Sequence, residues 1–164
     1  MNKVRKTIYK FYQLREFMST NLLKMIYQAL IQSVLNYGIR IWGSACSTAL
    51  KHLVTTQKHI LKIIFKKPKQ YPTQNLFFDS QVSTIRELYS KSILKYMKND
   101  ERYRNQIQHN INTRAVTSEN IFLTGVRFMA CQRHIAFVGP RLFNLVPANI
   151  RAITSLVGYT LYRL

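Results

Sequence analysis

Apolar residues recur at helical spacing through most of the first hundred positions. Residues 3–18 and 22–34 each carry an apolar stripe of this kind, and Ser19 between them is a residue type that caps the start of a helix. The second stripe is wide enough for a helix in the centre of a core, and Gly38 and Gly43 limit its length. Its apolar members are Leu22, Leu23, Ile26, Tyr27, Leu30, Ile31 and Val34.

Two further long helices follow from the same kind of pattern. The third is expected over residues 49–67, where one face is apolar and the other is basic. Two prolines interrupt the basic linker after it, and a short helical turn is expected at 73–77. Thr84 and Glu87 have the three-residue separation of a capping box, which predicts a fourth long helix over residues 84–98.

The helical pattern weakens after the fourth helix. Residues 99–120 are polar and have no regular period, which predicts a loop. Short apolar runs in residues 121–138 are expected as extended segments or strands. Beyond Gly139-Pro140 the chain is expected to form short helical pieces broken by Pro147, followed by a last helix near the C-terminus.

Together these elements predict a mainly α fold. It is expected to be a small helical bundle of about four to five helices, with a less regular C-terminal third that holds the short strands or extended chain. The expected regions are a helical part at 1–98, a polar loop at 99–120 and a C-terminal segment at 121–164. A chain of 164 residues is long enough for one compact domain, so the two outer regions are expected to form a single unit.

The chain is strongly basic. Twenty-five Lys and Arg stand against six Asp and Glu, which gives a formal net charge of +19. Such a charge repels itself in a compact protein and favours a polyanionic partner, with nucleic acid first and an anionic membrane surface as the alternative. No uncharged apolar run reaches the roughly 18 residues that a transmembrane helix needs, so no transmembrane span is expected.

The sequence also bears on the compartment. The N-terminal stretch MNKVRKTIYKFYQLREFM is basic but lacks the apolar centre and cleavage site of a secretory signal. The two cysteines, Cys46 and Cys131, cannot form a disulfide framework and fit a reducing environment. We therefore expect an intracellular protein, in a nuclear or cytoplasmic ribonucleoprotein.

Few residues of this chain have the chemistry of a catalytic centre. Nucleotide polymerisation requires clustered carboxylates that hold two divalent ions, but the two aspartates, Asp79 and Asp100, lie on different expected segments. The phosphate-binding glycine loops and the paired cysteines of zinc sites are missing from the sequence. We therefore expect no enzymatic activity from this chain alone, no metal site and no cofactor.

The sharpest charge pattern lies on the expected third helix. At 100° per residue its lysines fall nearly opposite its apolar face, and more lysines follow in the linker. Ammonium groups along one side of a rigid helix can follow a line of phosphates, so this face is the expected nucleic-acid contact. Most Tyr and Phe fall on expected core stripes, so no base-stacking residue is assigned. The candidate contacts are Lys51, Lys58, Lys62, Lys66, Lys67 and Lys69.

Four segments, in order, resemble one known family. The stretch LREFMSTNLLKMIYQALIQSVLNYGIRIWGSA, the pair Gln57-Lys58, the turn at 73–77 and the closing stretch VGPRLFNLVPANIR are similar to the region after the palm in non-LTR retrotransposon reverse transcriptases of the jockey and CR1 kind. The similarity covers residues from about 10 to 151. The matching residues are Tyr37, Gly38, Trp42, Gly43, Gln57, Gly139, Pro140, Asn144, Pro147 and Arg151.

The resemblance implies a thumb-like helical region of an RNA-directed DNA polymerase. The paired aspartates of the family's polymerase motif and its endonuclease are not in this chain, so catalysis is expected of the parent polyprotein instead. The implied partners are RNA or an RNA:DNA hybrid, bound with little sequence specificity, and the palm and fingers of the parent enzyme. By the same resemblance Gln57 and Lys58 face template or primer, and most other matching residues are structural.

Two alternatives to this prediction are open. Basic amphipathic helices also suit a module that lies on an anionic membrane surface. The other alternative is a retroelement remnant that has no present function and whose core evolved to pack against a palm domain that is missing.

Overall fold

The computed structural model of the chain describes residues 2–100, 121, 123 and 125–147. These residues are mainly helical and include no strand, which confirms the expected mainly α fold class. Most of the expected polar loop, Arg151 and the expected last helix lie outside the described residues. The chain divides into two compact units, which are Met1–Ile39 with Ala45–Arg86 (unit 1) and Arg40–Ser44 with Glu87–Leu164 (unit 2).

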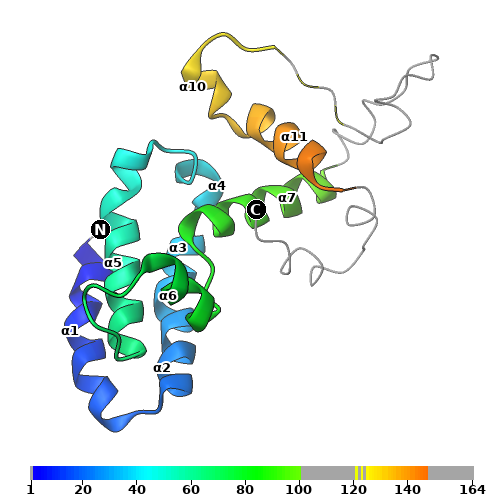
Figure 1. The fold of residues 1–164 in the computed structure, drawn as a ribbon. Coiled ribbons are helices and arrows are strands. Elements are labelled where there is room, and N and C mark those ends of the chain that lie inside the picture. Colours follow the sequence, from blue (N-terminus) through cyan, green and yellow to red (C-terminus); the bar gives the residue numbers. More distant parts are fainter. Residues whose placement is uncertain (1, 101–120, 122, 124, 148–164) are drawn as a thin grey trace. The chain divides into compact units, whose positions relative to one another are not determined.

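Unit 1 is built from three helical runs and one short helix. α1 (Asn2–Phe17) and α5 (Ser47–Ile64) lie side by side and run in the same direction (Figure 1). The run between them in sequence returns in the opposite direction, and the short helix α6 (Thr73–Ser80) packs against α5. The returning run consists of α2 (Thr20–Tyr27), the π-helical turn η1 (Gln28–Gln32) and α3 (Ser33–Asn36).

Apolar side chains from every one of these helices fill the core of unit 1. Large side chains with almost no exposed surface each stabilise the fold by roughly 1.5–3 kcal/mol relative to a solvated position. The helical periods read from the sequence place these residues on inward faces, as expected. The core residues include Phe11, Leu23, Tyr27, Ile31, Leu35, Leu50, Ile60, Leu61, Ile64, Leu76, Phe77 and Ile85.

The returning run begins as the sequence predicts, because the Ser19 hydroxyl accepts a hydrogen bond from the Leu22 backbone N–H at 3.4 Å. Every fourth residue after Leu23 is then buried, up to Leu35. An α-helix has 3.6 residues per turn, so a four-residue spacing would drift around it by about 40° each time. The wider turn η1 offsets this drift. The Ser33 hydroxyl donates to the Ala29 carbonyl there, at 2.5 Å.

Only one side of the returning run is buried in unit 1. The other side exposes large apolar residues, so the expectation of a helix in the centre of the core is wrong for this half of the stripe. The exposed residues, which we call the exposed apolar face, are Leu22, Met25, Leu30 and Val34.

A tight backbone turn follows α3. Gly38 has a φ of 63°, in the left-handed region that side chains with a Cβ rarely adopt, and this explains glycine at a position that the resemblance marks. The ring of the preceding residue, Tyr37, is exposed. The next helix is α4 (Ile39–Trp42), whose Trp42 is half-buried, as is Gly43 after it.

The third long helix is shorter at its C-terminus than the sequence predicts. α5 ends at Ile64, and Lys66 adopts a left-handed φ of 50° in the turn that follows. Lys67 precedes Pro68, and the residue before a proline disfavours helical backbone, which is the physical reason for the early end. The expected helical boundary at residue 67 is therefore wrong, and Lys66 and Lys67 belong to the loop.

Unit 2 contains most of α7 (Ile85–Asn99), which closely matches the expected fourth helix, and two helices among the described residues of the C-terminal third. These are α10 (Met129–Gln132) and α11 (Ile135–Leu145). The His134 side chain caps α11 by accepting a hydrogen bond from the Ala136 N–H at 3.3 Å. The run HIAFV is thus largely helical, and its expected extended conformation is wrong.

Gly139 and Pro140 lie inside α11, so the helix begins before this pair and not beyond it as expected. Pro140 has no N–H for the carbonyl of Ala136, but Ala136 is exposed and water can satisfy that carbonyl. α11 ends before Pro147, with Val146 in extended backbone, as the sequence predicts for a helix that approaches a proline.

The closing Gly-Pro segment holds unit 2 together at two points. A Cβ on Gly139 would lie 3.0 Å from both Cγ and Cε of buried Met97 and closer still to its Sδ, so glycine permits the close approach of α11 to α7. Asn144 binds the backbone of Ile121 twice, since its Nδ2 donates to the carbonyl at 2.8 Å and its Oδ1 accepts from the N–H at 2.9 Å. These contacts give the matching residues an architectural role.

Candidate nucleic-acid interface

The side of α5 that carries the lysines points away from the core of unit 1. Leu50, Ile60, Leu61 and Ile64 are buried on one side of the helix. On the other side Lys51, His52 and His59 are exposed, and Lys58 and Lys62 are half-buried. Half-burial of a lysine places its methylene stem against the protein and leaves its ammonium group toward water. α5 therefore presents a basic surface as its sequence predicts.

Lys62 differs from the other lysines of this face. Its ammonium group donates a hydrogen bond to the backbone carbonyl of Lys69, in the loop beyond α5. This contact fixes the position of the loop relative to the last turn of the helix. Lys62 is therefore placed as a loop tether, which makes it a weaker candidate for phosphate contact than the sequence indicates.

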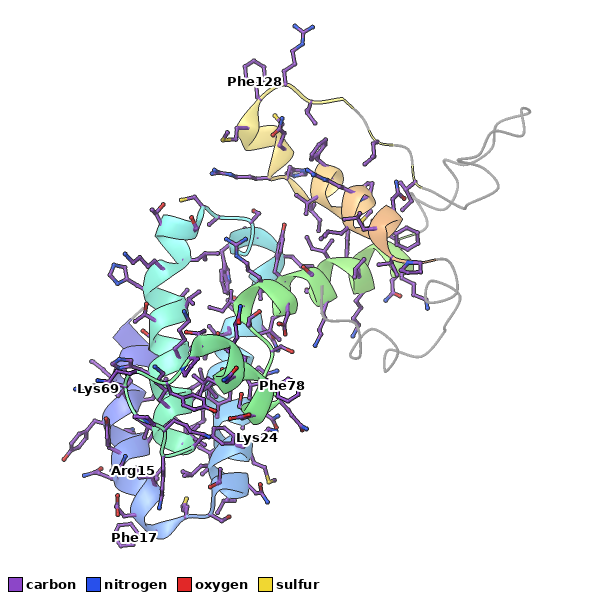
Figure 2. All side chains as sticks on the ribbon, viewed as in Figure 1. Arg15, Phe17, Lys24, Lys69, Phe78 and Phe128 are labelled. Atoms are coloured by element: carbon purple, nitrogen blue, oxygen red, sulfur yellow. The ribbon has the colours of Figure 1, made fainter. Side chains whose placement is uncertain are left out.

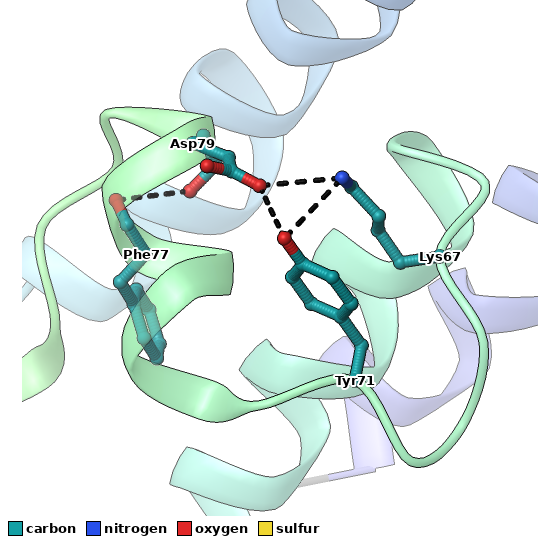
Figure 3. A network of polar contacts seen from close by, with 5 residues as sticks. Lys67, Tyr71, Phe77 and Asp79 are labelled. Carbon is teal, nitrogen blue, oxygen red and sulfur yellow. Dashed lines mark hydrogen bonds and ion pairs between the residues drawn. The ribbon is translucent and has the colours of Figure 1, made fainter.

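Lys67 is also engaged within the protein (Figure 3). Its Nζ lies 3.2 Å from Asp79 Oδ2, and it donates to the Tyr71 hydroxyl at 3.4 Å. The Tyr71 hydroxyl in turn donates to the same carboxylate oxygen at 2.7 Å, and the ammonium sits 4.4 Å from the centroid of the Tyr71 ring. The three side chains join the loop to α6. Lys67 is thus mainly a loop residue with an internal counterion.

Lys67 and Asp79 stabilise each other's charged forms around neutral pH. Hydrogen bonds from Tyr71 and then Lys67 lower the pKa of the Asp79 carboxyl below its ordinary value of 3.8. The hydrogen bond to Asp79 raises the pKa of the Lys67 ammonium above its ordinary value of 10.5. The stabilisation from the Lys67–Asp79 ion pair is therefore fully present at pH values between 3.8 and 10.5. It is lost as pH falls through the lowered Asp79 pKa or rises through the raised Lys67 pKa.

Replacing Asp79 with Asn is expected to strengthen binding to a nucleic-acid duplex. The change removes the counterion of Lys67 and one negative charge beside the basic loop. One additional phosphate contact raises affinity by up to about tenfold near 0.1 M salt. Fluorescence anisotropy with an RNA:DNA hybrid measures this. Tyr71→Phe is the control because it keeps the carboxylate, so its affinity should stay near that of the wild type; a folded Asp79→Asn chain that binds no better contradicts the expectation.

Four of the six candidate lysines keep an uncompensated charge. Lys51, Lys58, Lys66 and Lys69 make no ion pair with any residue that the structure describes. Lys51 and Lys58 lie along α5, and Lys66 and Lys69 lie in the exposed loop at its end. The helical part alone spans roughly 20 Å from Lys51 to Ile64, at about 1.5 Å per residue. We call these four residues the basic face.

Gln57 does not face a ligand outside the protein. It is only 1% exposed, and its Nε2 donates to the Tyr27 hydroxyl and to the Ser83 carbonyl, both at 3.0 Å. Burial raises the pKa of Tyr27 to about 12, despite the opposing effect of this hydrogen bond. The expectation that Gln57 faces template or primer is therefore wrong. It is a structural residue that joins α5 to α2 and to the segment before α7.

Several aromatic rings lie on the surface, although the sequence analysis placed most Tyr and Phe on core stripes and assigned no base-stacking residue. Tyr9, Tyr12, Phe17, Phe78 and Phe128 are all exposed. Figure 2 shows Phe17, Phe78 and Phe128 pointing away from the ribbon. For α1 the signal was present in the sequence, because these aromatic residues fall outside the apolar stripe at positions 4, 8, 11, 14 and 18. These exposed rings were missed because the aromatic residues were counted without regard to the side of the helix on which each one lies.

No family model, curated protein or solved structure was found to match this chain. The resemblance to retrotransposon reverse transcriptases therefore stays a prediction that rests on its sequence motifs. Among the described residues there is no group of three His, Cys, Asp or Glu side chains that could hold a metal ion. No helix within the described ranges is long and apolar enough to cross a membrane.

Proposed function

We propose that this chain is a non-catalytic module that binds RNA or an RNA:DNA duplex through the basic face. The observation that carries the proposal is the set of four lysines without an ion pair among the described residues, on a chain of net charge +19. Their positions along α5 and the loop beyond it form an extended surface that suits a line of phosphates. Lys62 supports this surface because its hydrogen bond to the Lys69 carbonyl holds the loop in place.

Binding of this kind depends little on the sequence of the nucleic acid. A lysine ammonium is a compact point charge that contacts phosphate oxygens, which are the same at every position of a duplex. Discrimination between bases requires side chains that reach the base edges, which lysines that follow a line of phosphates do not supply. The affinity is therefore chiefly electrostatic.

We further propose that the chain is the C-terminal, thumb-like part of a retrotransposon RNA-directed DNA polymerase. The order of its motifs supports this. So does the structural use of the closing segment, in which Gly139 and Asn144 make specific contacts with Met97 and Ile121. Polymerisation itself would belong to a palm domain with paired aspartates in the parent protein. An upstream reading frame that encodes such a palm would establish the parentage.

Salt dependence tests the nucleic-acid proposal directly. If about six phosphates are neutralised, affinity for an RNA:DNA hybrid should fall on the order of a thousandfold between 50 and 200 mM salt, because counterions are released on binding. Filter binding at a series of salt concentrations measures the slope. A flat response, or no binding in dilute buffer, contradicts the proposal.

A second candidate function is docking onto another protein domain, and the exposed apolar face favours it. Leu22, Met25, Leu30 and Val34 lie along one side of a single helical run, where isolated proteins seldom gather large apolar residues. The palm or fingers of a parent enzyme would cover such a face, and a remnant that lost its palm would expose it. An isolated chain that aggregates, and becomes soluble only beside a palm domain, would support this role.

A further inference from the structure

The outward side of α1 carries aromatic rings between cationic side chains. Tyr9 is 68% exposed and Tyr12 is 45% exposed, and Lys6 and Lys10 are exposed as well. At about 100° per residue, Tyr12 lies about 60° from Tyr9 on one side around the helix, and Lys6 and Lys10 lie about 60° and 100° from Tyr9 on the other side. Phe11, on the opposite side, is buried in the core of unit 1. The rings and cations therefore share one solvent-facing surface.

Contacts within α1 orient both rings. The Arg15 guanidinium carbon lies 4.9 Å from the centroid of the Tyr12 ring, and the Gln13 amide donates to the Tyr9 hydroxyl at 3.1 Å. Rings that are already positioned lose less conformational entropy when a flat ligand stacks on them. The charge of the stacked Arg15 is paired with Glu16 at 3.0 Å, so the cations that favour an anionic ligand on this surface are Lys6 and Lys10.

The charge distribution along α1 indicates the same class of ligand. The sequence places Lys3, Arg5 and Lys6 near the start of the helix, and its first turn has no acidic residue. The N-terminal end of a helix carries partial positive charge, so cations there are unfavourable. Lys6 and Lys10 are, in addition, like charges four residues apart, which repel each other. A bound polyanion removes both costs.

We propose that this surface of α1 binds single-stranded nucleic acid. Bases stack on Tyr9 and Tyr12, and the phosphates on the side of Tyr9 away from Tyr12 lie near Lys6 and Lys10. The inference rests on the proposed function and adds to it a contact that depends on aromatic rings and requires unpaired bases. Between Lys6 and Glu16 the exposed residues of α1 are Lys, Tyr, Gln and Glu. Among its described side chains Phe17 is the only exposed one that is wholly apolar, which is less than the Trp, Phe and Leu face with which a helix enters a lipid surface.

The test compares two probes on the full chain, a short labelled oligouridine and a blunt RNA:DNA hybrid. Tyr9→Ala combined with Tyr12→Ala is expected to weaken oligouridine binding at least about tenfold, because each stacked base contributes to affinity. Tyr9→Phe combined with Tyr12→Phe is the matched control. It keeps the rings and should bind within about twofold of the wild type. Hybrid binding should stay nearly unchanged in both variants.

The outcomes separate this inference from the function on which it rests. A wild-type chain that binds neither probe contradicts the proposed function itself. Salt-dependent hybrid binding together with unchanged oligouridine affinity in the alanine variant overturns the α1 inference alone, and so does an equal loss on both probes. Vesicles of phosphatidylserine that bind the chain through the same tyrosines, without competition from oligouridine, would assign the surface to lipid and also overturn it. Circular dichroism of each variant confirms that the helices are intact.

Discussion

A chain in which Lys51, Lys58, Lys66 and Lys69 are all replaced by Gln is expected to bind an RNA:DNA hybrid roughly four-thousandfold more weakly near 0.1 M salt. Each phosphate contact contributes a factor of slightly under ten at this concentration, through counterion release, and the four contributions multiply. The slope of log affinity against log salt should become shallower by about one for each lysine removed. Anisotropy titrations at several salt concentrations measure both quantities.

The matched control removes the same charge from other places. Lys24, Lys91, Lys95 and Lys98 are replaced by Gln, which lowers the net charge equally but leaves the basic face intact. If affinity depended only on net charge, the two variants would bind alike. A much smaller loss in the control locates the contact on α5 and its loop. Equal affinities for wild type and the basic-face variant, both folded, would refute this location.

Replacing Gly139 with Ala is expected to destabilise unit 2, although Ala normally stabilises a helix interior. Replacing Gly with Ala inside a helix usually increases the free energy of unfolding by about 0.5–1 kcal/mol, because Gly loses more backbone entropy on folding. Here the new Cβ would overlap the side chain of Met97, which is flexible but only 1% exposed and so has little space to move into. Overpacking of a core typically costs about 1–3 kcal/mol, so the clash should outweigh the gain. Thermal unfolding followed by circular dichroism should show a melting temperature lower by several degrees.

Two further variants test whether the clash is the cause. A Cβ at Gly125 meets nothing within 4 Å, so Gly125→Ala should change stability little. Met97→Ala opens space beside Gly139, so Gly139→Ala should cost much less in that background than in the wild type. Such coupling between neighbours is what a double-mutant cycle measures. Additive effects would show that Gly139 acts for another reason.

The helical periods predicted most of the fold because they depend on local sequence. The Ser19 cap, the inward face of α5 and the bounds of α7 all follow from the spacing of apolar residues and from helix-capping chemistry. The early end of α5 could also have been predicted from the sequence, because Lys67 stands before a proline. Gln57 falls among Leu50, Leu53, Ile60 and Ile64 on the apolar face, and this position predicts burial more reliably than its polarity predicts exposure.

Other features depend on residues that meet only in the folded chain. Nothing near Asn144 in sequence indicates that its amide binds Ile121, and nothing near Lys67 indicates a counterion at position 79. The fraction of the α2 stripe that stays exposed likewise depends on which helices lie beside it. Candidate lysines could thus be identified from charge and spacing, but their division into uncompensated and engaged groups required tertiary contacts.

The π-helical turn in the returning run of unit 1 holds about one residue more than an ordinary helix would need there. Leu23 and Leu35 are twelve positions apart, which at about 100° per residue would place them about 120° apart around an α-helix, yet both are buried. Removing one residue between Gln28 and Gln32 and restoring the α-helix would bring the two side chains to within about 20° of each other. Related chains should therefore accept a one-residue deletion inside this turn, whereas the same deletion elsewhere in the run would rotate Leu35 by about 100° away from α1 and α5.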